Sequence, residues 1–194
     1  MRLFLAVELD EAVRRAAADT ARRLAAALDR RGAGRAVSWV APGSLHFTLH
    51  FLGEVDDPTA RTLVERMAPP LTTPPFDLAL AGLGTFPPSG PPRVIWLGVG
   101  DGAAGLAAVH REIGARLDGL RVARERRPFS AHLTLGRVKA PPGPRLAEAI
   151  AETAAAADAR CRVDHVTLFE SRLSPRGASY SVIATARLGY HQPS

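Results

Sequence analysis

Short runs in which apolar and polar positions alternate recur along the chain, and such alternation is typical of β-strands with one buried face. In the clearest run, the residues expected to face the core are Leu45, Phe47, Leu49 and Phe51. His46 and Thr48 would then point the other way. The same reading predicts strands over residues 2–8, 36–40, 44–53, 76–86, 93–99, 129–138, 162–171 and 179–188.

Between these runs, apolar residues recur every three or four positions, which indicates amphipathic helices. We expect helices over residues 10–31, 57–68, 103–118 and 143–158. Asp10 is suited to cap the first helix, and Pro58 would lie in the first turn of the second. Cleanly alternating strands favour antiparallel sheets with one face under helices and the other face open.

One short pattern occurs twice, as His46-Phe47-Thr48-Leu49 and as His132-Leu133-Thr134-Leu135. In each copy the imidazole and the hydroxyl leave the same face of a strand, within reach of one small anion. A single copy would be a weak signal, because short motifs match by chance. Two copies nearly half the chain apart, both in strand-like runs, are what two copies of one structural unit would produce.

The chemistry that fits this pair of motifs is displacement at phosphorus, which needs one base and one acid. Two imidazoles can fill both roles near neutral pH, since the ordinary pKa of histidine is about 6.5. The hydroxyls of Thr48 and Thr134 could donate to the phosphate oxygens as negative charge develops there. No metal or other cofactor is needed for this chemistry.

The pattern as a whole predicts an α+β fold of two mostly antiparallel sheets, with helices on the outer faces and a central cleft. If the open faces of the two sheets line that cleft, the two His-Thr pairs come together. We expect residues 1–194 to form a single bilobal catalytic domain with two pseudo-symmetric lobes, each of which carries one His-x-Thr motif.

The chain resembles the 2H phosphoesterase superfamily, which is named for two such motifs. Within it, the chain is most similar to the bacterial and archaeal RNA 2′,3′-cyclic phosphodiesterases, also described as 2′-5′ RNA ligases. The resemblance runs nearly end to end, through residues 2–7, 38–53, 92–99, 127–138 and 166–175. It implies a LigT-like bilobal fold and metal-independent hydrolysis of a 2′,3′-cyclic phosphate at an RNA end to a 2′-phosphate.

Carried onto matching positions, the resemblance implies that His46 is the proton donor and His132 the proton acceptor. Thr48, Thr134 and Arg137 would bind the phosphate. Strict alternation from His132 places Arg137 on the wrong face, so its role requires a bulge, a strand end or a long reach. Otherwise Arg137 is a solvated residue at a strand terminus.

His50 departs from the family, which often has Arg or Lys at this position. On alternation it shares a face with His46 and Thr48, and we interpret it as a structural polar neighbour. The remaining histidines, His110, His165 and His191, fall outside the motifs and receive no role.

A net charge of +6 favours an anionic partner. The arginines of the 10–31 helix are most simply a solvated face. A second group, which precedes the second motif, is expected to assist RNA binding; it comprises Arg121, Arg124, Arg126 and Arg127. The single Cys161 rules out an intrachain disulfide, and no run is apolar and long enough to span a membrane. We therefore expect a cytoplasmic monomer with no membrane association and no obligate protein partner.

Three alternatives stay open. The chain could be a non-catalytic module that binds RNA ends, or another 2H-type phosphodiesterase that acts on small cyclic nucleotides. A metallohydrolase using His46, His50 and His132 would lack a nearby carboxylate ligand and would leave the threonines unexplained. The sequence also leaves open which RNA is the physiological substrate, and whether the reaction is hydrolysis or reversible 2′-5′ ligation.

Overall fold

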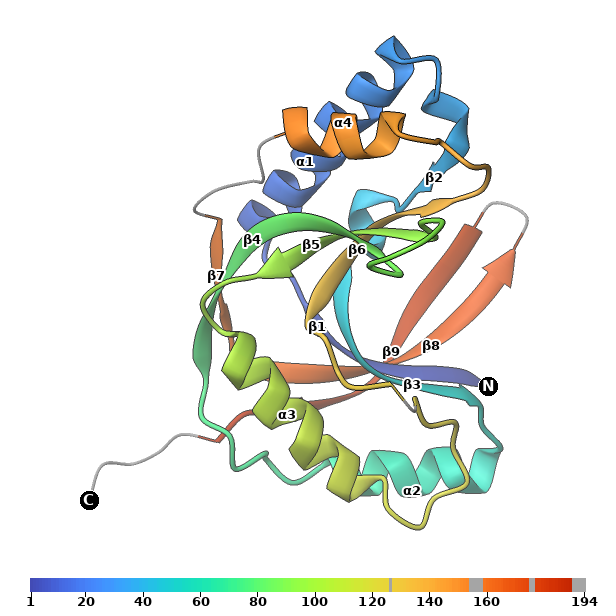
Figure 1. Cartoon of the computed structure of the whole chain (residues 1–194). Coiled ribbons are helices and arrows are strands. Elements are labelled where there is room, and N and C mark those ends of the chain that lie inside the picture. Colours follow the sequence, from blue (N-terminus) through green and yellow to red (C-terminus); the bar gives the residue numbers. More distant parts are fainter. Residues whose placement is uncertain (126, 154–158, 175–176, 190–194) are drawn as a thin grey trace.

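The computed structural model describes residues 1–125, 127–153, 159–174 and 177–189 (Figure 1). The strands are β1 (Arg2–Glu8), β2 (Val37–Trp39), β3 (His46–Glu54), β4 (Phe76–Phe86), β5 (Val94–Val99), β6 (His132–Val138), β7 (Arg160–Val163), β8 (His165–Ser174) and β9 (Gly177–Arg187). The helices are α1 (Glu11–Arg30), α2 (Asp57–Met67), α3 (Ala103–Arg116) and α4 (Arg145–Glu152), with 3₁₀ turns η1 (Gly34–Ala36) and η2 (Pro42–Ser44).

The strands form two sheets. One has four strands in the order β3-β1-β8-β9, and the other has five in the order β2-β6-β5-β4-β7. Neighbouring strands in both sheets pair antiparallel. The predicted α+β class with antiparallel sheets is therefore confirmed. The division of residues 1–194 into two lobes around a cleft stays a prediction.

Two pairs of helices pack on these sheets (Figure 1). α1 packs on α4 and against β6 and β7, whereas α3 packs on β3 and α2 on β9. Asp10 caps α1 as expected, because its carboxylate accepts a hydrogen bond from the Val13 amide at 2.8 Å. Pro58 lies in the first turn of α2.

The buried apolar side chains form three clusters. The largest runs through both sheets and reaches α1, α2 and α3; it includes Leu5 of β1, Leu133 of β6 and Ile113 of α3. A second joins α1 to α4 and β5. The third is small and lies on the other face of the four-stranded sheet, where Phe4 and Phe169 pack together. This face of the four-stranded sheet, which carries Phe4, is called its open face below.

Two predicted elements differ from the structure. The strand expected over 162–171 is wrong, because the chain breaks at Asp164 into β7, which pairs with β4, and β8, which pairs with β1. The apolar alternation shifts by one position at the break, from Cys161 and Val163 to Val166 and Leu168, but this shift does not say which sheet each half joins. The helix expected over 143–158 is shorter. α4 ends at Glu152, and residues 154–158 lie outside the described part of the chain.

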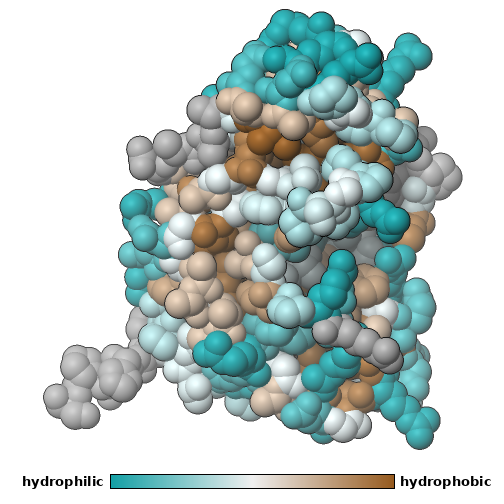
Figure 2. All heavy atoms as spheres, in the orientation of Figure 1, coloured by the Kyte–Doolittle hydropathy of each residue, from teal (hydrophilic) through white to brown (hydrophobic). Residues whose placement is uncertain are grey.

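The arginines of α1 form the solvated face that the sequence predicts, and most meet nearby acids. Figure 2 shows hydrophilic side chains gathered at the top of the view, over the end of α1. There the Arg31 guanidinium lies 2.6 Å from the Glu152 carboxylate on α4. No helix among the described residues is long and apolar enough to cross a membrane.

Candidate active site

The first motif begins β3, and strand register decides which way its side chains point. His46 lies directly across from Glu8 of β1, and Thr48 lies across from Ala6. Because directly opposed residues of antiparallel strands share a face, His46 and Thr48 lie on the same side as Ala6. Ala6 belongs to the cluster of Phe4 and Phe169, so both motif residues are on the open face.

The ring of His46 is oriented by a backbone contact. Its Nδ1 lies 2.8 Å from the carbonyl oxygen of Ser44, two residues before it. A carbonyl oxygen only accepts, so Nδ1 carries the proton and donates. In the neutral ring the lone pair is therefore on Nε2, for which the described residues offer no hydrogen-bond partner.

The second motif begins β6 and repeats this arrangement. The Nδ1 of His132 donates to the carbonyl oxygen of Ser130 at 2.7 Å, again two residues before the ring. Its Nε2 is likewise without a partner in the part of the chain that the structure describes. His132 lies across from Gly98 and Thr134 across from Trp96, so both share one face of the five-stranded sheet.

A β-bulge follows each motif at the same offset. In β3, Thr48 and His50 lie across from the consecutive residues Ala6 and Leu5, so Leu49 is the extra residue. In β6, Thr134 and Gly136 lie across from Trp96 and Ile95, so Leu135 is the extra residue. Each bulge reverses the alternation for the residues that come after it.

The bulge at Leu49 overturns the prediction that His50 shares a face with His46. His50 lies across from Leu5, which is buried in the large core cluster, and therefore points toward α3. Its Nε2 donates to the carbonyl oxygen of His110 at 2.8 Å, and the two rings stack 4.1 Å apart. Burial lowers the pKa of His50. His50 therefore has a structural environment against α3 and is not a neighbour of His46 on the motif face.

The bulge at Leu135 supplies the condition that Arg137 requires. After the bulge, Arg137 lies across from Val94. Val94 is two residues from Trp96 on a regular stretch of β5, so Arg137 shares a face with Thr134 and His132. Its side chain is exposed, and no described residue forms an ion pair with it.

Aromatic rings contact both histidines. The ring of Phe4 lies 4.9 Å from that of His46, and Tyr180 meets His46 edge-on at 5.3 Å. Phe86 meets His132 edge-on at 4.9 Å. These contacts hold each imidazole against an apolar surface.

The surroundings of the two histidines differ in charge. Burial lowers the pKa of His46, while the hydrogen bond to Ser44 and the negative charge of Glu8 act in the opposite direction. Glu8 is itself positioned, because it accepts a 2.7 Å hydrogen bond from the buried Thr167 hydroxyl. Its carboxylate also lies 3.6 Å from Nε2 of His165. Across from His132 there is only Gly98.

Sequence reasoning did not find Glu8, because its link to His46 is a register pairing between distant strands. It also gave no role to His110 or His165, which contact His50 and Glu8 respectively. His191 lies outside the described residues.

The structure brings the two motif strands into contact. β3 is the edge strand of its sheet and packs against β6 of the other sheet. Figure 1 shows the two strands running close together near the centre of the molecule. The two His-Thr pairs therefore lie on neighbouring strands, although they are far apart in the sequence.

Two of the four arginines expected to assist RNA binding form ion pairs, and no ion pair is found for Arg121 among the described residues. Arg124 forms a 3.0 Å ion pair with Asp118, and Arg127 forms a 2.7 Å ion pair with Glu125. Arg126 lies outside the described residues. The role of this group in RNA binding stays a prediction.

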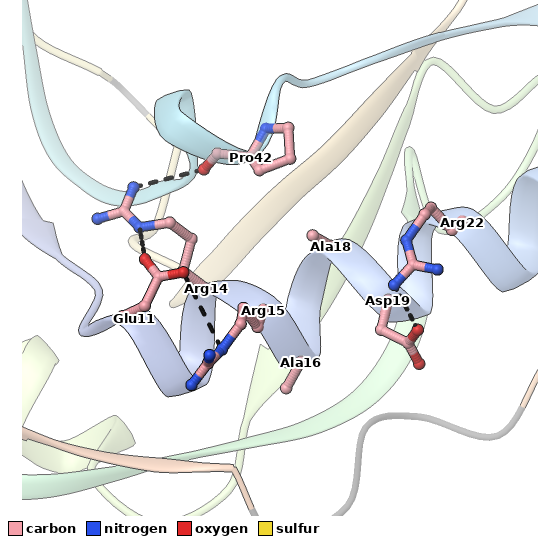
Figure 3. Close-up of a pocket in the computed structure, with 8 residues that line it drawn as sticks. All are labelled: Glu11, Arg14, Arg15, Ala16, Ala18, Asp19, Arg22 and Pro42. Atoms are coloured by element: carbon pink, nitrogen blue, oxygen red, sulfur yellow. Dashed lines mark hydrogen bonds and ion pairs between the residues drawn. The ribbon is translucent and has the colours of Figure 1, made fainter.

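A hollow of about 540 Å³ lies beside α1 rather than at the motifs (Figure 3). Its charged residues pair with one another: Glu11 meets Arg14 and Arg15, and Asp19 meets Arg22. Arg14 also donates to the carbonyl oxygen of Pro42 at 3.4 Å, which ties α1 to η2 just before the first motif. None of the predicted site residues lines this hollow, so it is separate from the candidate active site.

Comparison with known proteins gives one consistent result. A family model described as the 2′-5′ RNA ligase superfamily matches residues 10–174. The RNA 2′,3′-cyclic phosphodiesterase of Archaeoglobus fulgidus is 33% identical over 180 residues, which is 93% of this chain and 96% of that protein. The protein of the same name from Methanothermobacter thermautotrophicus is 34% identical over 190 residues, covering 97% and 99%. A crystal structure of a Thermus thermophilus protein superposes with a TM-score of 0.75 at 32% identity, covering 97% of this chain and 98% of that one.

Proposed function

Because this chain belongs to the 2′-5′ RNA ligase superfamily, we propose that it is a metal-independent RNA 2′,3′-cyclic phosphodiesterase that leaves a 2′-phosphate. The observation that carries the proposal is the duplicated histidine geometry. Each ring donates from Nδ1 to the carbonyl oxygen two residues before it, and each leaves Nε2 without a protein partner among the described residues. Two imidazoles held in this way are prepared to move one proton each.

The reaction follows from these two nitrogens. Nε2 of His132 takes a proton from water as the water oxygen attacks phosphorus. The bond from phosphorus to the 3′ oxygen breaks, and Nε2 of His46 gives its proton to that oxygen. The phosphate stays on the 2′ oxygen, and proton exchange with solvent resets both rings.

Charge supports this division of roles between the histidines. A general acid must hold its proton before the reaction, and a carboxylate nearby stabilises an imidazolium. Glu8 lies across from His46, whereas His132 faces Gly98. Burial lowers the pKa of His46 in the free protein, but a bound phosphate anion would raise it again by direct charge attraction.

The proposed phosphate-binding roles of Thr48, Thr134 and Arg137 rest on the side to which their side chains point, which is the side of the motif histidine on the same strand. The two hydroxyls stand two residues after their histidines on the same faces. The bulge at Leu135 brings Arg137 to the face of Thr134. Donors placed in advance around the phosphate oxygens stabilise the charge that builds up in the transition state.

The metallohydrolase alternative loses its ligand set, because His50 faces α3 and not the side of His46. The RNA-end-binding module could use the same two Nε2 atoms to hold a phosphate, so it is separated from the enzyme by whether a product forms. A 2H phosphodiesterase for small cyclic nucleotides uses the same residues and is separated only by substrate preference. Reversible 2′-5′ ligation differs only in that a 5′ hydroxyl replaces water.

Two further points belong to the proposal. Cys161 is buried, and a chain with this single cysteine fits a reducing compartment, so we assign the protein to the cytoplasm. We also assign it as a monomer that needs no other protein to act on an RNA end.

The decisive experiment supplies a short RNA that ends in a 2′,3′-cyclic phosphate. We expect a 2′-phosphate product, formed at the same rate in the presence of a strong chelator. A 3′-phosphate product would show that the leaving oxygen is wrongly assigned, and loss of turnover with the chelator would contradict metal independence. Tight binding without any product would favour the binding module. A higher kcat/KM for 2′,3′-cyclic mononucleotides than for RNA would favour the small-nucleotide enzyme.

A further inference from the structure

A column of three stacked rings joins α3 to the regions of both motifs. The ring of His50 stacks on that of His110 at 4.1 Å, with 7° between the two planes. Phe129 stacks on the other face of His110 at 4.2 Å and 15°. His50 belongs to β3, His110 to α3, and Phe129 to the segment that leads into β6. The ring column therefore connects three elements that are distant in the sequence.

One end of the ring column is fixed to β3. The bulge at Leu49 turns His50 toward α3 and, contrary to the strict alternation expected from the sequence, leaves Phe51 42% exposed on the open face. His50 contacts His110 twice, through the ring stack and through the 2.8 Å hydrogen bond from its Nε2 to the backbone carbonyl. Burial lowers the pKa of both imidazoles, so both rings are neutral near pH 7 and no charge repulsion opposes the stack.

The other end of the ring column reaches the second motif. Phe129 directly precedes Ser130, whose carbonyl oxygen accepts the 2.7 Å hydrogen bond from Nδ1 of His132. The described residues between Arg121 and Ala131 form no helix or strand. Regular backbone hydrogen bonds therefore do not fix the carbonyl of Ser130, whereas the ring of the preceding Phe129 is held against α3.

The first motif is held differently. Ser44, whose carbonyl orients His46, is the last residue of the turn η2. Its amide donates to the carbonyl oxygen of Ala41 at 2.8 Å. A local turn thus sets the position of Ser44, while Ser130 has the stacked ring of Phe129 beside it instead.

We propose that His110 is a positioning residue for His132 and acts through Phe129 and Ser130. It holds the base at a fixed place relative to β3, because His50 anchors the other end of the ring column. This rests on the proposed function, in which His132 takes the proton from water. Although α3 carries none of the proposed site residues, a displacement of about 1 Å at a reacting group can cost roughly 10²-fold in rate.

The kinetic test removes the middle ring. We expect His110→Ala to lower kcat about tenfold or more, with KM within about twofold of the wild-type value, because proton transfer demands closer alignment than phosphate binding. His110→Phe keeps a ring between His50 and Phe129 and should restore the wild-type kcat. Steady-state kinetics on a cyclic-phosphate RNA measures both variants. An unchanged kcat in His110→Ala, or an equal loss in His110→Phe, would overturn the positioning role.

Loss of stability has to be separated from loss of position. Val109→Ala removes a fully buried side chain from the same helix and leaves the ring column intact. It should lower the free energy of unfolding in urea, with kcat unchanged wherever the protein is folded. His110→Leu keeps apolar bulk without a ring, so it should lose kcat as His110→Ala does, and it replaces that variant if the alanine protein does not fold. Equal kcat values in Val109→Ala and in the ringless variants would overturn the proposal.

A spectroscopic measurement observes the positioned ring directly. In protein labelled with nitrogen isotope at histidine, long-range proton–nitrogen NMR correlations show which ring nitrogen carries the proton in the neutral form. In the wild type, His46 and His132 should both carry it on Nδ1. In His110→Ala, His132 should become a mixture of both tautomers, while His46 keeps its form because Ser44 lies in a turn. An unchanged tautomer of His132 would contradict the proposal.

The same spectrum separates this proposal from the proposed function, because it requires no turnover. If the wild type hydrolyses nothing, but His132 loses its tautomer preference in His110→Ala and keeps it in His110→Phe, the positioning role stands and the proposed reaction fails. If turnover occurs, and His110→Ala matches the wild type in both the spectrum and kcat, the reaction stands and the positioning role fails.

Discussion

The strands that carry His46 and His132 share their local design and differ in their surroundings. Each begins with a histidine whose Nδ1 donates to the carbonyl oxygen two residues earlier, and each has a bulge three residues after the histidine. The likeness is local because it depends on backbone hydrogen bonds and strand register.

The differences lie at equivalent positions on the two strands. Across from the histidine there is Glu8 in one case and Gly98 in the other. Five residues after the histidine, the first strand presents Phe51 and the second Arg137 on the face of the motif. A repeated backbone thus supplies two imidazoles of the same orientation, and neighbouring strands give them different roles.

The largest effect should come from removing either imidazole. His46→Ala and His132→Ala should each lower kcat by about 10²–10⁴-fold, the usual contribution of one positioned proton transfer. Steady-state kinetics on a cyclic-phosphate RNA measures this, with circular dichroism to check that each variant is folded. If one variant keeps full activity, the two strands do not divide the acid and base roles as proposed.

Arg137→Ala tests the difference five residues after the histidine. Loss of a charge-assisted contact to phosphate, at about 1.5–3 kcal/mol, corresponds to a fall in kcat/KM of roughly 10- to 100-fold. Because Arg137 would contact the reacting phosphate, RNA and mononucleotide substrates should lose equally. An effect on RNA alone would indicate that Arg137 contacts the RNA upstream of the reacting phosphate.

Glu8→Gln tests the charge difference between the two histidines. Loss of the carboxylate removes an effect that raises the pKa of His46, so that pKa falls. If His46 is the general acid, the alkaline limb of the rate profile should move to lower pH. If His46 were the base, the acidic limb would move instead.

Thr167→Val provides the matched control, because it removes the hydroxyl that holds Glu8 but keeps the charge. It should reproduce the shift of the alkaline limb only in part. A pH profile that is identical in wild type and in Glu8→Gln would show that the carboxylate does not act on the reaction.

The smallest effect concerns stability. It involves the position four residues after the histidine, which is His50 in β3 and Gly136 in β6. The ring of His50 stacks on the ring of His110. Burial and the adjacent His50 lower the pKa of His110 to about 4. The unfolded chain, with an ordinary pKa near 6.5, then binds more protons than the folded one between these values. Stability should therefore fall as the pH drops from about 6.5 to about 4.

His110→Phe keeps a ring for His50 and Phe129 to stack on but cannot titrate. It should flatten the pH dependence of the free energy of unfolding in this window, by at most about 1.4 kcal/mol per pH unit. Partial solvent exposure of His110 makes the actual change smaller. Urea titrations across this pH window measure it, and parallel curves for both proteins would contradict the prediction.

The amino-acid sequence by itself determined the repeated His-x-Thr pattern, most strand and helix positions and the α+β class. These follow from alternation, helical periodicity and caps such as Asp10, all of which act over a few neighbouring residues. The family resemblance added the roles expected for His46, His132 and the phosphate-binding residues. For Arg137 the sequence allowed a phosphate-binding role only on condition of a bulge, a strand end or a long reach.

Only the tertiary structure decided which side chains share a face after each motif. The bulges at Leu49 and Leu135 turn His50 away from the open face and bring Arg137 and Phe51 onto the motif faces. Tertiary structure also decided that Glu8 opposes His46 and that the chain breaks at Asp164 to join two sheets. The physical reason is that strand pairing joins distant segments, and a one-residue slip between them reverses every side chain that follows.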